Sequence, residues 1–159
     1  MLTHEPTIRE LTVPEMHALL RAERVGRVGF VWREHVDMQP IHYVFDGEAI
    51  YARTSPGSKL TALRHSPWVA FEVDAVRDTY EWRSVVAHGT AYVLRGGGTA
   101  AQRETYRRAV DLLRAIEPDA LTADDPVRDR DVLLRIAVDR LTGRAALGPA
   151  SRVVPRSRG

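Results

Sequence analysis

The pair Asp46-Gly47 separates two strand-like stretches, 36–45 and 49–52, and ties them into one hairpin. Asp-Gly is favoured in type I′ turns because both central residues of such a turn have positive φ. Stretches that alternate apolar and polar residues are typical of half-buried strands. Further strands are predicted at 27–33, 68–74, 82–94 and 132–139. The sequence therefore predicts a mainly β fold, an antiparallel barrel with flanking helices.

Two residues interrupt these predicted strands. Pro40 cannot donate to a strand ladder, so it indicates an edge, a bulge or a place where a ligand replaces a neighbouring strand. Gly89 indicates a bulge or a close backbone approach. The segment 121–131 has no strand or helix pattern and is expected to be a mobile acidic–basic loop, and residues 141–144 are expected to follow the end of the last strand.

Two capping boxes predict helices. Thr12 and Glu15 enclose Pro14, an arrangement favoured in the first turn, and the helix is expected to end near Val25-Gly26. Thr99 and Gln102 form the second box. Apolar residues at helical spacing follow it and are expected to pack on the core: Tyr106, Val110, Leu113 and Ile116.

The stretch 51–60 contains Lys59, the only lysine among 23 basic residues. A strand leads through a turn at 55–58 into a short helix over 59–65, which ends before a proline. Hydroxyl groups, cations and free backbone N–H groups at a helix start form an anion site, and phosphate is its usual occupant. The residues gathered at this junction are Arg53, Thr54, Ser58 and Lys59.

A simpler interpretation of the junction stays open. Ser58 would then only cap the helix, Gly57 would only form the turn, and Lys59 would be solvated. A nucleoside triphosphatase is not expected, because the stretch lacks the longer glycine-rich loop of the Walker pattern and the Ser or Thr that follows its lysine.

Composition limits the alternatives. A chain of 159 residues fits one domain over 1–150, followed by a disordered basic tail over 151–159. The absence of cysteine excludes disulfides and thiolate chemistry and suits a cytoplasmic protein. No apolar run resembles a signal peptide or a membrane span. The net charge of +2 is interspersed, so neither nucleic acid nor a membrane is an expected partner.

No catalytic pattern is present. None of the six histidines lies in an HExxH motif, no serine lies in a Gly-x-Ser-x-Gly elbow, and no GxGxxG follows a strand. Glu72 and Asp74 share a strand face. They are more simply explained as residues of a solvated sheet face or as ion-pair partners of arginines than as catalytic carboxylates or metal ligands. A barrel with an anion site and no acid, base or nucleophile favours a bound cofactor that carries the chemistry.

The ordered set of motifs resembles the pyridoxamine 5′-phosphate oxidase-like family of FMN-binding split barrels, in particular its small actinobacterial branch. The resemblance covers about residues 11–95 and resumes near the last strand. Its motifs are Pro40-Ile-His-Tyr43, Asp46-Gly47, Arg53-Thr54 with Gly57-Ser58-Lys59, Val69–Asp74, Trp82–Gly89, and Leu134-Arg-Ile with Thr142-Gly143-Arg144.

The resemblance implies a split barrel of antiparallel Greek-key type that binds FMN. Ser58 and Lys59 would hold the phosphate. Ser84 would approach the flavin from the partner subunit of a homodimer, and Arg144 is a further candidate. The other residues that it implies line the ribityl chain and phosphate (Ala52, Arg53, Thr54) or the isoalloxazine ring (Gln39, Pro40, Ile41, His42).

The function implied is flavin-dependent oxidoreduction of a small organic molecule, with a nicotinamide electron donor. Alternatives are a relative that binds 5-deazaflavin or haem, and a flavin-binding module without catalysis. Two departures argue against oxidation of vitamin B6. Ser58 replaces the arginine that commonly precedes the lysine, and the C-terminal substrate-binding segment of the true oxidases has no match.

Overall fold

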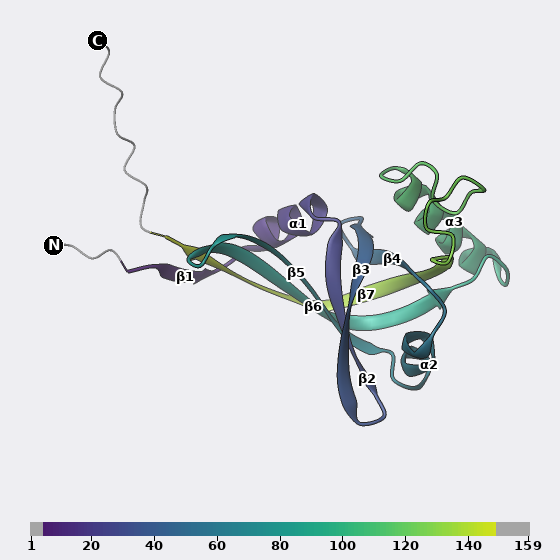
Figure 1. The fold of residues 1–159 in the computed structure, drawn as a ribbon, viewed down its shortest axis with the longest axis horizontal. Helices are drawn as coiled ribbons and strands as arrows, with labels where there is room; N and C mark the ends of the chain where they lie inside the picture. Colours follow the sequence, from purple (N-terminus) through teal and green to yellow (C-terminus); the bar gives the residue numbers. More distant parts are fainter. Residues whose placement is uncertain (1–4, 149–159) are drawn as a thin grey trace, which may run out of the picture.

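The computed structural model describes residues 5–148, which form seven strands and three helices (Figure 1). The elements in chain order are β1 (Thr7–Glu10), α1 (Val13–Ala22), β2 (Val25–Trp32), β3 (His35–Phe45), β4 (Ala49–Thr54), α2 (Ser58–His65), β5 (Trp68–Asp78), β6 (Glu81–Leu94), α3 (Ala100–Arg114) and β7 (Val132–Leu147).

Six antiparallel strands close into a barrel. The order is β7-β4-β3-β2-β5-β6, and a β6–β7 pairing joins the two ends of this sheet. β1 pairs with the far half of β7, where Thr7 lies opposite Leu147. In Figure 1 the long strands β5, β6 and β7 extend together toward β1, while α3 lies at the opposite end. The predicted antiparallel barrel with flanking helices is confirmed.

The barrel core is built from the alternating apolar residues of the strands. Phe71 and Val73 of β5 are buried there, as are Ile41, Tyr43 and Phe45 of β3. α1 covers this core with Met16, Leu19 and Leu20, and the Tyr43 hydroxyl donates a hydrogen bond to the Leu20 carbonyl at 2.9 Å. This bond fixes the end of α1 against β3.

A second apolar cluster lies outside the barrel, beneath α3. Ala109 and Leu113 of the helix pack there with Ala49, Tyr51 and Leu133 of the sheet, and Tyr106 and Val110 border them. The predicted apolar stripe is confirmed within the helix, whereas Ile116 lies beyond its end at Arg114. α3 thus covers the outer face of β4 and β7.

Both predicted capping boxes are present, at Thr12–Glu15 and Thr99–Gln102. The predicted end of the first helix was wrong, because α1 stops at Ala22 and Val25 already begins β2. A side chain at Gly26 could not be accommodated, since its Cβ would lie 2.2 Å from the Phe71 ring. Gly26 is therefore packed closely against β5 as part of β2, and it is not a helix-ending residue.

The hairpin between β3 and β4 is confirmed, but its turn is not type I′. Three residues connect the strands, and Gly47 alone among them has positive φ, at 102°. The Asp46 carboxylate accepts hydrogen bonds from the N–H groups of Glu48 and Ala49 at 2.9 and 2.8 Å. The Asp46 side chain thus holds the turn closed through its hydrogen bonds to the backbone.

Further boundaries differ from the prediction. β4 extends to Thr54, β5 extends to Asp78, and β7 extends through 141–144 to Leu147. β1 was not predicted. The bulge at Gly89 is confirmed: the register of β6 against β7 shifts there, and a Cβ would lie 2.0 Å from the Ala137 carbonyl oxygen. Pro40 pairs with Arg27 of β2, while β4 reaches only to His42, so Pro40 lies where β3 has a free edge.

Candidate functional site

A cavity of about 390 Å³ opens at the junction of β4 and α2. Its walls come from three segments that are distant in the sequence: the free edge of β3, the stretch 53–59, and the loop between α3 and β7. The lining residues are Gln39, Pro40, Arg53, Thr54, Ser55, Pro56, Gly57, Ser58, Lys59 and Arg130.

The start of α2 presents backbone donors without a side-chain cap. Gly57 is the N-cap residue and makes no side-chain cap hydrogen bond, and the first turn holds no acidic residue. The idea that Ser58 caps the helix is therefore wrong, because Ser58 is already its first residue. A Cβ at Gly57 would meet nothing within 4 Å, so the approach to these N–H groups is open.

Lys59 is a buried cation with an incomplete set of partners. Its side chain is 6% exposed, and Nζ donates a hydrogen bond to Thr54 Oγ1 at 3.0 Å. Within residues 5–148 no carboxylate forms an ion pair with it. Burial lowers the pKa of Lys59, as does the positive charge of Arg130, while Asp37 opposes the shift. The interpretation of Lys59 as a solvated residue is thus wrong.

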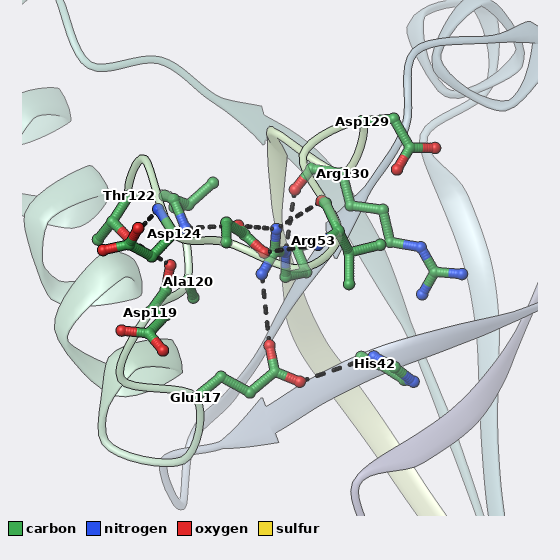
Figure 2. A network of polar contacts seen from close by, with 12 residues as sticks. His42, Arg53, Glu117, Asp119, Ala120, Thr122, Asp124, Asp129 and Arg130 are labelled. Carbon is green, nitrogen blue, oxygen red and sulfur yellow. Dashed lines mark hydrogen bonds and ion pairs between the residues drawn. The ribbon is translucent and has the colours of Figure 1, made fainter.

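Arg53 does not extend into the cavity as a free cation. Its side chain is 2% exposed, and its Nη2 donates to Asp125 Oδ2 at 2.5 Å and to the Val127 carbonyl at 3.1 Å. Nη1 donates to Glu117 at 3.3 Å and Nε donates to the Arg130 carbonyl at 2.9 Å (Figure 2). Arg53 lines the cavity, but its guanidinium is bound to acceptors of the protein itself.

The loop 115–131 folds around Arg53. Asp125 is 5% exposed and also accepts from the N–H groups of Leu121 and Val127. The hydrogen bond from Arg53 and these backbone bonds lower the pKa of Asp125 to about 2. Ser55 Oγ donates to Asp129 at 3.2 Å and fixes the loop to the turn before α2. The expectation of a mobile loop over 121–131 was wrong, because a buried ion pair organises it.

Three of the expected flavin-lining residues lie away from this cavity. The side chains of Ile41 and Ala52 belong to the barrel core, so these residues offer only backbone groups. His42 lines a separate space of about 210 Å³ beneath α3, with its Nδ1 3.8 Å from Glu117. Of the ring-side residues, Gln39 and Pro40 lie at the cavity.

Ser84 and Arg144 are brought together, but at another place. They lie opposite each other on β6 and β7 and line a cavity of about 540 Å³ near α1. Ser84 Oγ donates to Glu72 at 3.0 Å. Arg27 pairs with Glu72 at 2.6 Å and with Asp74 at 2.8 Å, which confirms the ion-pair interpretation of these carboxylates.

Comparison with known proteins decides the family. A family model described as pyridoxamine 5′-phosphate oxidase matches residues 12–145. The chain belongs to this family. A curated relative from Rhizobium meliloti is 24% identical over 82 residues, and the matched part is 54% of that protein, so the chain spans about half of its length.

Solved structures of similar fold cover almost the whole chain of this family member. A FAD-binding protein from Mesorhizobium loti is 25% identical, with a TM-score of 0.70, over 90% of this chain and 99% of that one. A conserved protein from Corynebacterium diphtheriae is 29% identical, with a TM-score of 0.64, over 88% and 98%. A FAD-binding protein from Mycobacterium smegmatis shares the fold at 23% identity, with a TM-score of 0.60, over 87% and 98%.

The fold adds residues to the site of this pyridoxamine 5′-phosphate oxidase family member that its sequence did not indicate. Arg130 lines the Lys59 cavity, and Ser55 and Pro56 complete its rim. Arg130 stands in a loop without periodicity or motif, so no local signal marks it. Within residues 5–148, no group of three His, Asp or Glu side chains is placed to hold a metal, and no helix has the length and apolar character to cross a bilayer.

The burial of Lys59 generates a prediction about the ligand-free protein. Lys59→Met keeps the aliphatic stem and removes a desolvated charge, so it should raise the free energy of unfolding by about 1 kcal/mol. Thermal unfolding measures this as a rise of the melting temperature by about 2–4 °C. The matched control is Arg64→Met on the exposed part of the same helix, which should change stability by less than about 0.5 kcal/mol. A destabilised Lys59→Met variant would contradict the prediction.

Proposed function

We propose that the chain binds FMN, with its phosphate in the Lys59 cavity, and acts as a flavin-dependent oxidoreductase on a small organic molecule. The observation that carries this proposal is Lys59, a buried cation that lines the cavity beside an uncapped helix start. The family membership and the relative named as FAD-binding support a flavin as the ligand.

A phosphate would complete the partners that Lys59 lacks. A charge-assisted hydrogen bond from a buried ammonium to phosphate offsets part of the cost of removing the cation from water. The Ser58 hydroxyl is exposed at the same rim, and the first backbone N–H groups of α2 favour an anion through the helix dipole. The chain would thus bind the charged end of the ligand through three kinds of donor.

The free edge of β3 suits the ring end of the ligand. At Gln39 and Pro40 the strand pairs with β2 on one side, and β4 reaches only to His42 on the other. Backbone groups of β3 on that open side would face the polar edge of the isoalloxazine ring. A bound flavin would supply the redox chemistry, and these residues would fix its position and exclude water from one side.

A homodimer would bring the remaining predicted residues to the same flavin. Ser84 and Arg144 line a different cavity from Lys59 in one chain, so a second copy is needed for both groups to meet one ligand. Met38 and Ala70 both lie opposite Gly29, which places them on one outer sheet face. This face, beside the cavity, carries exposed apolar side chains suited to an interface: Val36, Met38 and Trp68, which are 79%, 62% and 65% exposed.

The first test compares two ligands. FMN should bind more tightly than riboflavin, which lacks the phosphate, and Lys59→Ala should weaken FMN binding by about ten- to a hundredfold while leaving riboflavin affinity unchanged. Fluorescence titration measures both constants, and Arg64→Ala on the same helix serves as the control. Equal affinity of the unchanged protein for FMN and riboflavin would overturn the phosphate assignment.

The second test concerns assembly. The flavin-bound protein should be a dimer by light scattering, and Met38→Glu should produce a monomer with weakened flavin binding, because a charge would be buried in the apolar interface. Val13→Glu, at an exposed apolar position of α1 away from this face, should leave both properties unchanged. A monomer that binds FMN at full affinity would exclude the shared site.

The third test separates an oxidoreductase from a flavin-binding module. Under anaerobic conditions NADH or NADPH should bleach the flavin absorbance near its visible maximum, and an added organic acceptor should restore it. No reaction with pyridoxamine 5′-phosphate is expected. If neither NADH nor NADPH reduces the bound flavin, the protein is better described as a flavin-binding module without catalysis. The first test shows independently whether it binds a flavin.

A further inference from the structure

We infer that Arg130 is a second phosphate-binding residue of the Lys59 cavity and that the buried Arg53–Asp125 pair positions it. This inference rests on the proposed function, because it concerns the same phosphate. Arg130 lies in the loop between α3 and β7, far from the junction in sequence, and lines the cavity beside Lys59.

The Arg130 side chain is half-buried and has no partner for its charge. Among residues 5–148 its guanidinium forms no hydrogen bond or ion pair, although its own backbone is fixed on both sides. Figure 2 shows this guanidinium turned away from the network around Arg53. Its positive charge lowers the pKa of Lys59, so the two cations are close enough to repel each other. An anion between them would relieve this repulsion.

The backbone of Arg130 is fixed through Arg53. The Arg130 carbonyl accepts from Arg53 Nε at 2.9 Å, and its N–H donates to the Val127 carbonyl at 3.1 Å. The same Val127 carbonyl accepts from Arg53 Nη2, and the Val127 N–H donates to Asp125. The carbonyl groups of Val127 and Arg130 are therefore both fixed to one buried guanidinium. The Arg130 side chain, which is not part of this network, lines the cavity.

The pair also lowers the negative charge of the loop. The loop is acidic, and unpaired carboxylates near the cavity would repel a phosphate. Arg53 neutralises Asp125 and contacts Glu117, and Ser55 donates to Asp129. The carboxylate that acts on the Lys59 pKa is Asp37 of β3, outside this loop. With Asp125 neutralised by Arg53, Arg130 adds a positive charge to that of Lys59, which suits the double negative charge of a phosphate monoester.

Arg53 and Asp125 act as positioning residues. Both are buried with side chains 2% and 3% exposed, and their polar atoms are occupied by each other and by the loop backbone. A buried ion pair contributes little to stability compared with apolar residues of the same volume. Its consequence here is a defined loop conformation, and through it a defined place for Arg130.

The test is a double-mutant cycle measured with FMN and riboflavin. Arg130→Gln should weaken FMN binding by about tenfold and leave riboflavin unaffected, and Arg130→Lys should recover part of the loss. Asp125→Asn should weaken FMN binding to a similar extent. The double variant should bind FMN no more weakly than Arg130→Gln alone, because Asp125 acts through Arg130.

The control is Arg128→Gln, which removes the same charge from the same loop at an exposed side chain outside the cavity and should change FMN affinity less than twofold. Arg130→Gln alters a side chain that forms no hydrogen bond within residues 5–148, so the variant should fold. Unchanged FMN affinity in Arg130→Gln, with FMN still preferred over riboflavin by the unchanged protein, would overturn this inference alone. If the losses of FMN affinity in Arg130→Gln and Asp125→Asn are fully additive in the double variant, Asp125 does not act through Arg130 and the positioning role is wrong. Absence of any preference for FMN in the unchanged protein would overturn the proposed function and this inference with it.

Discussion

The pairing of β6 with β7 is the interaction on which the rest of the structure depends. It runs from Trp82 opposite Ala146 to Leu94 opposite Leu133 and turns an open sheet into a barrel. Closure encloses the barrel core, and it pairs the edges that β6 and β7 would otherwise expose. The other edge of β7 pairs with β4, where Thr54 lies opposite Val132. This second pairing brings the loop that enters β7 to the turn before α2, where Ser55 contacts Asp129. The candidate site thus depends on both edges of β7 being paired.

Buried charge distinguishes the two ends of that site. Arg53 and Asp125 compensate each other, and the backbone of the loop satisfies their remaining hydrogen-bonding groups. Lys59 lies six residues after Arg53, and within the described part of the chain its partner is a hydroxyl group and not a carboxylate. Arg53 and its ion pair therefore hold one side of the cavity in place. On the other side Lys59 is a buried cation whose desolvation an anion would offset.

Local rules predicted much of this fold. The strand alternation of β3, the two capping boxes, and the strand–turn–helix order around Lys59 each depend on residues close in sequence, and the structure confirms them. The errors arose where distant contacts decide. β1 has four exposed residues and no alternation, so only its pairing with β7 defines it as a strand. The same holds for the partners of Arg53 and for Arg130, because nothing near position 53 indicates a loop that begins more than sixty residues later.

β7 pairs with β1, β4 and β6, and it is the last element of the described chain. During synthesis β4 and β6, which are the two ends of the sheet without β7, therefore leave the ribosome well before β7, which joins them. Until β7 emerges, β4 and β6 present unpaired backbone groups and the barrel core lacks a wall, which is the condition under which nascent β proteins associate with one another. Contacts between residues so far apart also slow folding. Soluble expression of this protein thus depends on its final third, and a truncation that removes β7 should cause aggregation even though it removes few residues.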